Sequence, residues 1–357
     1  MSLWADKYRP TTLDQLTYHK GLTRQLKQMA ASENIPHMLF YGPSGAGKKT
    51  RITAILREIF GPGVEKLKVD ERQFATTSRK KMVFTIVSSN YHLELNPSDL
   101  GMYDRVIVQD VIKGVAQSKQ LDANAKHQFK VVIIDQADEL TREAQAALRR
   151  TMEKHTSTMR LILCCNSLSK IIAPVRSRCL LIRVARPSER EVSTALQTIA
   201  QLEKFILPTQ LAQNIAKHTQ CNLRASLLAL ESTAVRRTNL EEVQKPDRVD
   251  WELVISKIAR MILDEQTPAK LLDIRKELYS LITHCIQPSL VMKNISFELA
   301  KSMDDKMRRI IFEKAAFHEH RMRKGQKHIF HLEAFVASIM HEYKMYVNNN
   351  NNNNLFK

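Results

Sequence analysis

The sequence predicts an α/β domain with a mostly parallel sheet, followed by a region that is entirely helical. Short β-branched apolar runs alternate with helical patterns up to residue 185. Strand signals stop after Arg186-Pro187, and only helical periodicity follows. The 357 residues also exceed one ordinary core, so we expect two or three domains.

The composition is that of a soluble globular protein, with 43% hydrophobic and 26% charged residues, which excludes disorder as the main state. The net charge of +18 lies mostly in residues 1–185 and favours a polyanionic partner. The first thirty residues contain no uninterrupted apolar stretch, so we expect neither a signal peptide nor a membrane span. Five cysteines without CxxC spacing indicate reduced thiols inside a cell.

Strands are expected where the apolar runs fall, at residues 37–41, 84–88, 130–135, 160–165 and 180–184. Residues 66–94 are different, because three strand pieces (66–70, 72–76 and 81–88) are divided by a polar turn at 77–80. We therefore predict a β-hairpin inserted into the first domain.

The helical region is predicted in two parts, 186–237 and 250–347, joined by a polar linker that contains Pro246. The first part holds three helices, which begin at a Ser188–Glu191 capping box and near Thr209 and Asn222. The second holds five helical patterns, one of them opened by Thr267 and Pro268. Residues 348–357 include seven asparagines and are expected to be disordered.

The strongest chemical signal is a glycine-rich loop that follows the strand at 37–41 and opens a helix. Its backbone N–H groups can surround a phosphate, and its lysine can reach the β and γ oxygens. The sequence therefore predicts a site for ATP or ADP. The loop consists of Gly42, Pro43, Ser44, Gly45, Ala46, Gly47, Lys48, Lys49 and Thr50.

Two positions depart from the pattern of an active ATPase. Lys49 stands where the motif has a Ser or Thr ligand for Mg²⁺, and the hydroxyl comes one residue later at Thr50. Asp135 ends an apolar strand and could hold Mg²⁺ through its water shell, but Gln136 follows where such ATPases carry glutamate. Glutamine can orient a water but cannot accept its proton. Both departures predict weakened hydrolysis with nucleotide binding retained, and the use of Mg²⁺ stays open.

Several short motifs follow one another along the chain: Tyr8-Arg9-Pro10, residues 36–50, the Asp135 strand, Ala147–Glu153, Ser177-Arg178-Cys179 and Asn222-Leu223-Arg224. Taken together, they resemble replication factor C, the eukaryotic sliding-clamp loader of the AAA+ class, over residues 1 to about 347. Within this family, the chain resembles the small subunit with a degenerate ATP site. This resemblance rests on Lys49, Gln136, the 66–94 insertion and the segment at 88–99. The resemblance implies a P-loop AAA+ domain (1–185), an all-α lid (186–237) and an all-α collar (250–347).

The resemblance also implies roles for single residues. Asn166 matches the sensor-1 residue near the γ-phosphate, and Arg224 matches the sensor-2 arginine of the lid. Tyr8, Arg9 and Pro10 match the segment near adenine. The family has glycine before Asn-Leu-Arg where this chain has Cys221, so the approach of the lid can differ.

Arg178 matches an arginine finger that enters the ATP site of a neighbouring subunit, where it acts in trans. Arg149 and Arg150 are candidates for the same interface, with a solvated helix face as the alternative. Arg105 and Lys113 are the candidates for contacts with DNA phosphates, again with solvation as the alternative.

The function expected from the resemblance is that of a non-catalytic or weakly catalytic clamp-loader subunit in the nucleus, acting in DNA replication and repair. Its implied partners are one large and three other small replication factor C subunits, the PCNA sliding clamp and primer-template DNA. Whether it joins loaders with a different large subunit stays open. Two other interpretations also stay open: an autonomous AAA+ DNA motor, and a scaffold that has lost nucleotide binding.

Overall fold

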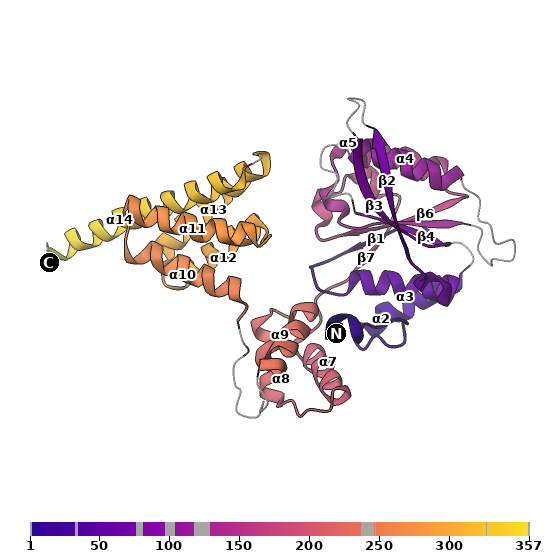
Figure 1. The fold of residues 1–357 in the computed structure, drawn as a ribbon, viewed down its shortest axis with the longest axis horizontal. Coiled ribbons are helices and arrows are strands. Elements are labelled where there is room, and N and C mark those ends of the chain that lie inside the picture. The colour runs from indigo at the N-terminus through magenta and orange to yellow at the C-terminus, as the bar shows by residue number, and fades with distance from the viewer. Residues whose placement is uncertain are drawn as a thin grey trace. The chain divides into compact units, whose positions relative to one another are not determined.

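The chain forms two compact units, Met1–Asp247 and Arg248–Lys357. Figure 1 colours the chain by residue number, from indigo at the N-terminus to yellow at the C-terminus. The structure is a computed structural model, and it describes residues 2–32, 35–75, 81–96, 104–117, 129–236, 246, 248–325 and 327–355. The first unit contains a sheet and a three-helix lid, and the described residues of the second unit form helices.

The described residues of the first unit form a sheet of seven strands in the order β2-β3-β4-β5-β6-β1-β7. Strands β4, β5, β6, β1 and β7 pair in parallel, whereas β3 pairs antiparallel with both β2 and β4. The prediction of a mostly parallel sheet is therefore confirmed. The strands are β1 (Met38–Tyr41), β2 (Lys68–Ala75), β3 (Lys81–Ser88), β4 (His92–Leu95), β5 (Lys130–Ile134), β6 (Met159–Cys165) and β7 (Leu180–Arg183).

The predicted hairpin is present as β2 and β3, paired from Lys68↔Ser88 to Ala75↔Lys81. The two pieces predicted at 66–70 and 72–76 form the single strand β2, and the predicted turn at 77–80 lies outside the described residues. Strand β4 was not predicted, because His92 and Glu94 interrupt its apolar residues, so it lacks the continuous apolar run that marks β1. Its parallel pairing with β5, from His92↔Val131 to Leu95↔Ile134, fixes its place in the sheet.

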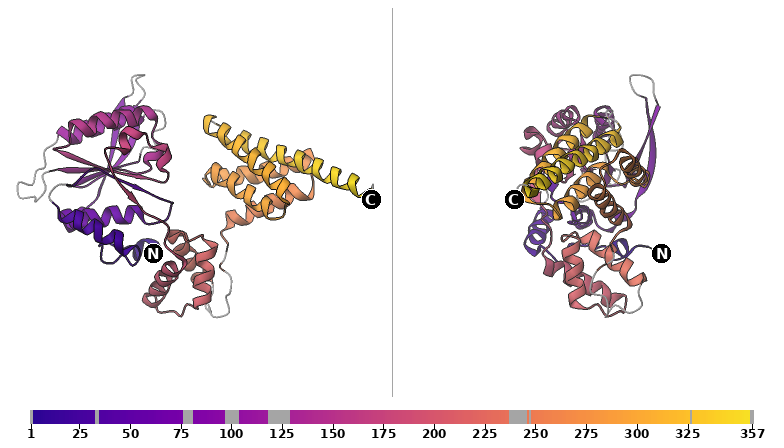
Figure 2. Two further views of the ribbon diagram at one scale, coloured as in Figure 1. Left: turned by 180° about the vertical axis from the view of Figure 1, so that it is seen from behind. Right: turned by 90° about the vertical axis from the view of Figure 1, so that its left-hand side faces the viewer.

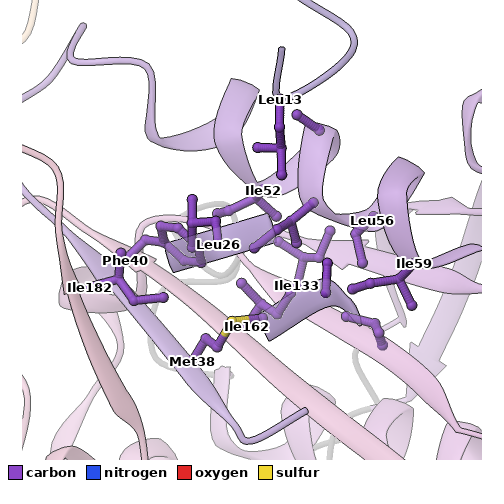
Figure 3. Packing of buried hydrophobic residues seen from close by; sticks show 14 of the residues in the cluster. Leu13, Leu26, Met38, Phe40, Ile52, Leu56, Ile59, Ile133, Ile162 and Ile182 are labelled. Carbon is purple, nitrogen blue, oxygen red and sulfur yellow. The ribbon is translucent and has the colours of Figure 1, made fainter. Parts of the chain in front are cut away.

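Helices cover both faces of the sheet, as the views in Figures 1 and 2 agree. Alternate strand residues face opposite sides, so each strand contributes to two apolar clusters. Val132 and Ile134 of β5 pack with α4 (Asp104–Gln117) and α5 (Arg142–Lys154). Val131 and Ile133 face α2 (Lys20–Ala31) and α3 (Lys48–Phe60). Figure 3 shows this second cluster, with Met38, Phe40, Ile162 and Ile182 of the sheet beside Leu26, Ile52, Leu56 and Ile59 of the helices.

The lid consists of α7 (Glu189–Leu202), α8 (Thr209–His218) and α9 (Leu223–Arg236). The Ser188 hydroxyl accepts from the Glu191 N–H, and the Glu191 carboxylate accepts from the Ser188 N–H, which is the predicted capping box. The short helix α1 (Trp4–Lys7) joins the lid, because the Trp4 ring stacks on Phe205 with centroids 5.6 Å apart. Shorter elements of the first unit are η1 (Pro62–Glu65), η3 (Ala137–Glu139), η4 (Leu168–Lys170) and α6 (Ala173–Arg176).

The described residues of the second unit form five helices around one apolar core. None of the helices in the described part of the chain combines the length and apolarity needed to cross a bilayer. The helices are α10 (Asp250–Asp264), α11 (Pro268–Thr283), α12 (Pro288–Lys301), α13 (Asp305–Lys324) and α14 (His328–Leu355).

The asparagine tract differs from the prediction. The structure continues α14 through all seven asparagines to Leu355, where we expected disorder over 348–357. Asparagine is a weak helix former but does not break a helix, and the packed first turns of α14 already supply the costly nucleus. Each further residue then requires only propagation of an existing helix.

Candidate functional site

A cavity of 470 Å³ lies in the first unit, where β1, β5 and β6 end. The carboxyl ends of parallel strands in such sheets are where ligands bind. The cavity is lined by residues from the glycine-rich loop, the three strand ends, the N-terminal segment and the lid: Ala5, Tyr8, Arg9, Pro10, Leu16, Tyr18, Ser44, Gly45, Gly47, Lys48, Lys49, Thr50, Asp135, Gln136, Cys164, Cys165, Asn166, Leu223, Arg224 and Leu227.

The loop between β1 and α3 needs glycine at three positions. A Cβ atom on Gly42, whose φ is 151°, would lie 1.9 Å from the Val184 carbonyl oxygen. Gly45 and Gly47 have φ values of 73° and 82°, in the left-handed region that other residues rarely adopt. A Cβ atom on Gly45 would lie 1.7 Å from Oδ1 of Asn222 in the lid, and one on Gly47 would lie 2.0 Å from the Tyr18 hydroxyl. The loop is therefore closely packed by both the N-terminal segment and the lid.

Lys48, the first residue of α3, is buried inside this loop. Its ammonium donates to the carbonyl oxygens of Gly42 at 2.8 Å and Pro43 at 3.0 Å, and to Oδ1 of Asn166 at 2.9 Å. Asn166 directly follows β6, which pairs in parallel with β1. The sheet thus brings the predicted phosphate lysine and the predicted sensor residue together from positions far apart in the sequence.

The next residue of α3, Lys49, contacts two carboxylates. Its ammonium forms an ion pair with Glu94 of β4 and lies 3.7 Å from Oδ2 of Asp135. The Thr50 hydroxyl accepts a hydrogen bond from Arg9 Nε at 3.2 Å. Glu94 was missed by the sequence reasoning, and the alternating His-Leu-Glu-Leu pattern was the one signal of its strand.

The residues after β5 are held by their backbone. Gln136 adopts a left-handed conformation with φ of 49°, and its N–H donates to Oδ1 of Asp135 at 3.0 Å. Asp138 lies in the 3-10 helix η3 and is buried. Its carboxylate accepts from the N–H of Asn166 at 3.3 Å, so it also fixes the residue that contacts Lys48.

Tyr18 and Arg51, both missed by the sequence reasoning, support the loop. The Tyr18 hydroxyl donates to the Ala46 carbonyl at 3.1 Å. The fully buried Arg51 stacks on the Tyr18 ring at 4.7 Å and donates to the Tyr18 carbonyl at 3.0 Å and to the Thr23 hydroxyl at 3.2 Å. Burial lowers the pKa of Arg51.

The N-terminal segment and the lid supply the rest of the lining. The Tyr8 hydroxyl donates a hydrogen bond to the Glu203 carboxylate of the lid at 2.6 Å, and Arg224 lies 3.6 Å from the Asp6 carboxylate. Leu223 and Leu227 of α9 add apolar surface. The predicted residues Tyr8, Arg9, Pro10 and Arg224 therefore all line one cavity with the loop.

Two cysteines also line the cavity, and both remain protonated at neutral pH. Burial is the main reason that the pKa of the Cys164 thiol is raised and that of Cys165 reaches about 12. In the described part of the chain, no three His, Cys, Asp or Glu side chains gather as a metal site.

Arg178 does not line the cavity. It follows α6 and is held by Glu153 of α5, with Nε donating a hydrogen bond at 2.8 Å and Nη2 forming an ion pair at 2.5 Å. The hydrogen bond from Arg178 is the main cause of a lowered pKa of Glu153, and Arg149 adds a contact at 3.5 Å. Arg149 and Arg178 therefore both contact Glu153, which does not line the cavity at the glycine-rich loop.

The two predicted DNA contacts lie on α4, also outside the cavity. Arg105 is exposed and forms an ion pair with Glu143 at 2.8 Å. Lys113 lies two turns later on the same helix, and its side chain is outside the described structure.

The cavity suits a nucleotide but does not suit Mg²⁺ as the motif would bind it. Lys48 offers a buried cation, and Leu223 and Leu227 offer an apolar surface for a base. The Mg²⁺ ligand position, however, holds the Lys49 ammonium, and the displaced hydroxyl of Thr50 is bound to Arg9.

The P-loop, the parallel sheet and the three-helix lid define a nucleotide-binding ATPase-type domain of the AAA+ class. A point mutant of Thermotoga maritima RuvB shares this fold, with a TM-score of 0.50 and 15% identity over 76% of this chain and 85% of that one. Family models match residues 18–188 ("DNA polymerase III, delta subunit"), 194–235 ("RCF1/5-like, AAA+ ATPase lid domain") and 251–347 ("Replication factor C subunit 3, C-terminal domain").

The full-length relatives are more specific. The chain is 50% identical to Neurospora crassa replication factor C subunit 5, over 97% of this chain and 99% of the relative. It is 47% identical to human replication factor C subunit 3 over the full length of both. The chain therefore belongs to the replication factor C small-subunit family.

Proposed function

We propose that this chain is a clamp-loader subunit that binds ATP or ADP, hydrolyses it weakly or not at all, and supplies Arg178 to a neighbouring subunit. This proposal rests on the separation of the nucleotide cavity, whose catalytic residues are altered, from the arginine finger. The chain's own cavity holds Lys49 and Gln136 in place of the usual Mg²⁺ ligand and water-activating glutamate. Arg178 lies outside that cavity on Glu153.

The partners follow from the family. We propose that the chain assembles in the nucleus with one large and three other small replication factor C subunits. The complex would load the PCNA sliding clamp onto primer-template DNA in replication and repair. The exposed Arg105 and the neighbouring Lys113 on α4 would contact phosphates, which would give a salt-dependent and sequence-independent affinity.

The test compares two substitutions in a reconstituted five-subunit complex with clamp and DNA. Arg178→Ala should reduce turnover at one neighbouring site by ~10³–10⁵, which is the usual contribution of an arginine finger. Lys48→Ala should leave total ATPase nearly unchanged, because this chain's own site contributes little. Arg176→Ala, two residues from the finger, controls for loss of positive charge.

The opposite order of effects would contradict the proposal. If Lys48→Ala causes the larger loss, the chain hydrolyses ATP itself. Brisk turnover by the isolated chain would favour an autonomous motor, and failure of ATP and ADP to bind would favour a nucleotide-free scaffold.

A further inference from the structure

The Lys49 ammonium lies between two carboxylates that come from neighbouring parallel strands. Glu94 of β4 pairs in register with Ile133 of β5, and Asp135 comes two residues after Ile133. Residues two apart on a strand face the same side, so Glu94 and Asp135 both point toward the sheet face that α3 covers. Lys49 lies in the first turn of α3 and meets both of them.

In the described loop, Lys49 and not a hydroxyl residue stands where the motif supplies its Mg²⁺ ligand. Mg²⁺ requires oxygen ligands in near-octahedral order at about 2.0–2.1 Å. Thr50 has a hydroxyl, but it lies one residue further around the helix and accepts a hydrogen bond from Arg9. The Lys49 ammonium also repels a divalent cation from the Asp135 carboxylate, 3.7 Å away.

We propose that the Lys49 ammonium replaces the divalent cation of this site, so that the chain binds its nucleotide without Mg²⁺. This inference rests on the nucleotide binding proposed above. The ammonium offsets the charges of Glu94 and Asp135, which would otherwise repel the phosphates. A single positive charge without exchangeable waters holds a nucleotide but does not organise a water for attack, which agrees with weak hydrolysis.

The experiment measures the affinity of the full chain for fluorescent ADP (a methylanthraniloyl derivative), once in Mg²⁺ and once in EDTA. For the unaltered chain the two dissociation constants should agree within threefold. Lys49→Thr restores the hydroxyl of the motif and removes the ammonium. Its affinity in EDTA should then be at least tenfold weaker than in Mg²⁺, because the two carboxylates are no longer neutralised.

Two variants keep the result interpretable. Lys49→Arg retains the charge and should remain independent of Mg²⁺. Lys27→Thr makes the same chemical change on α2, where Lys27 pairs with Asp14 outside the cavity, and should behave like the unaltered chain. Circular dichroism of each variant verifies that it is folded.

The outcomes separate this inference from the proposed function. A tenfold or larger loss of affinity in EDTA by the unaltered chain overturns the inference, and so does a Lys49→Thr variant that binds equally well in both conditions. If the unaltered chain binds no ADP in either condition, nucleotide binding itself is refuted, and the inference with it.

Discussion

Replacing Gly47 by alanine tests how tightly the phosphate loop is packed. Gly47 caps α3 with φ of 82° and ψ of 27°, and a Cβ atom there would lie 2.0 Å from the Tyr18 hydroxyl oxygen. Tyr18 cannot easily move away. It is 5% exposed, donates to the Ala46 carbonyl, and is covered by the Arg51 guanidinium.

Two contributions set the expected cost of Gly47→Ala. The left-handed conformation costs a residue with a Cβ about 1–2 kcal/mol. Inserting a methyl group into a well-packed region costs about 1–3 kcal/mol more. The free energy of unfolding of the first unit should therefore fall by about 2–5 kcal/mol.

The assay is urea unfolding followed by tryptophan fluorescence. The chain has two tryptophans, and a Trp251→Phe background leaves Trp4, which stacks on Phe205 in the first unit. Gly21→Ala is the control, because Gly21 lies in α2 with nothing within 4 Å of its Cβ position. That change should raise stability by at most about 1 kcal/mol.

A double-mutant cycle isolates the packing contribution. Tyr18→Phe removes the oxygen that the new methyl group would meet, so in the Gly47→Ala background it should restore about 1–3 kcal/mol. In the unaltered background the same change should cost about 1 kcal/mol for the lost hydrogen bond. A coupling below about 0.5 kcal/mol, or a Gly47→Ala variant as stable as the parent, would refute the packing argument.

Two further predictions concern the lid and the buried histidines. Cys221→Gly should stabilise the first unit by about 0.5–1 kcal/mol, since Cys221 has φ of 58° where glycine is unstrained; a lower melting temperature would contradict this. Burial lowers the pKa of His37 and His92, so below about pH 6.5 the unfolded state binds more protons and the first unit becomes less stable. The urea concentration at the midpoint of unfolding should decrease when the pH is lowered from 7.5 to 5.5. An increase of this midpoint on acidification would show that these histidines are protonated in the folded chain.

Much of the fold could be predicted because its signals are local. The phosphate loop is one continuous segment, and the Ser188 capping box and the antiparallel hairpin depend on neighbours in sequence. Strand β4 was missed because His92 and Glu94 break up its apolar residues, and its place is fixed by pairing with β5. The helix through the asparagines was missed because composition does not show that a packed helix precedes the tract.

The sequence by itself determined that the chain has a phosphate loop with lysine at the Mg²⁺ position and glutamine after Asp135. Only the tertiary structure decided what that lysine contacts. The partnership of Lys49 with Glu94, and of Lys48 with Asn166, depends on strand order and register, which bring residues distant in sequence to one edge of the sheet. Side-chain periodicity specifies which face of a strand is buried, but it does not specify which strands are neighbours.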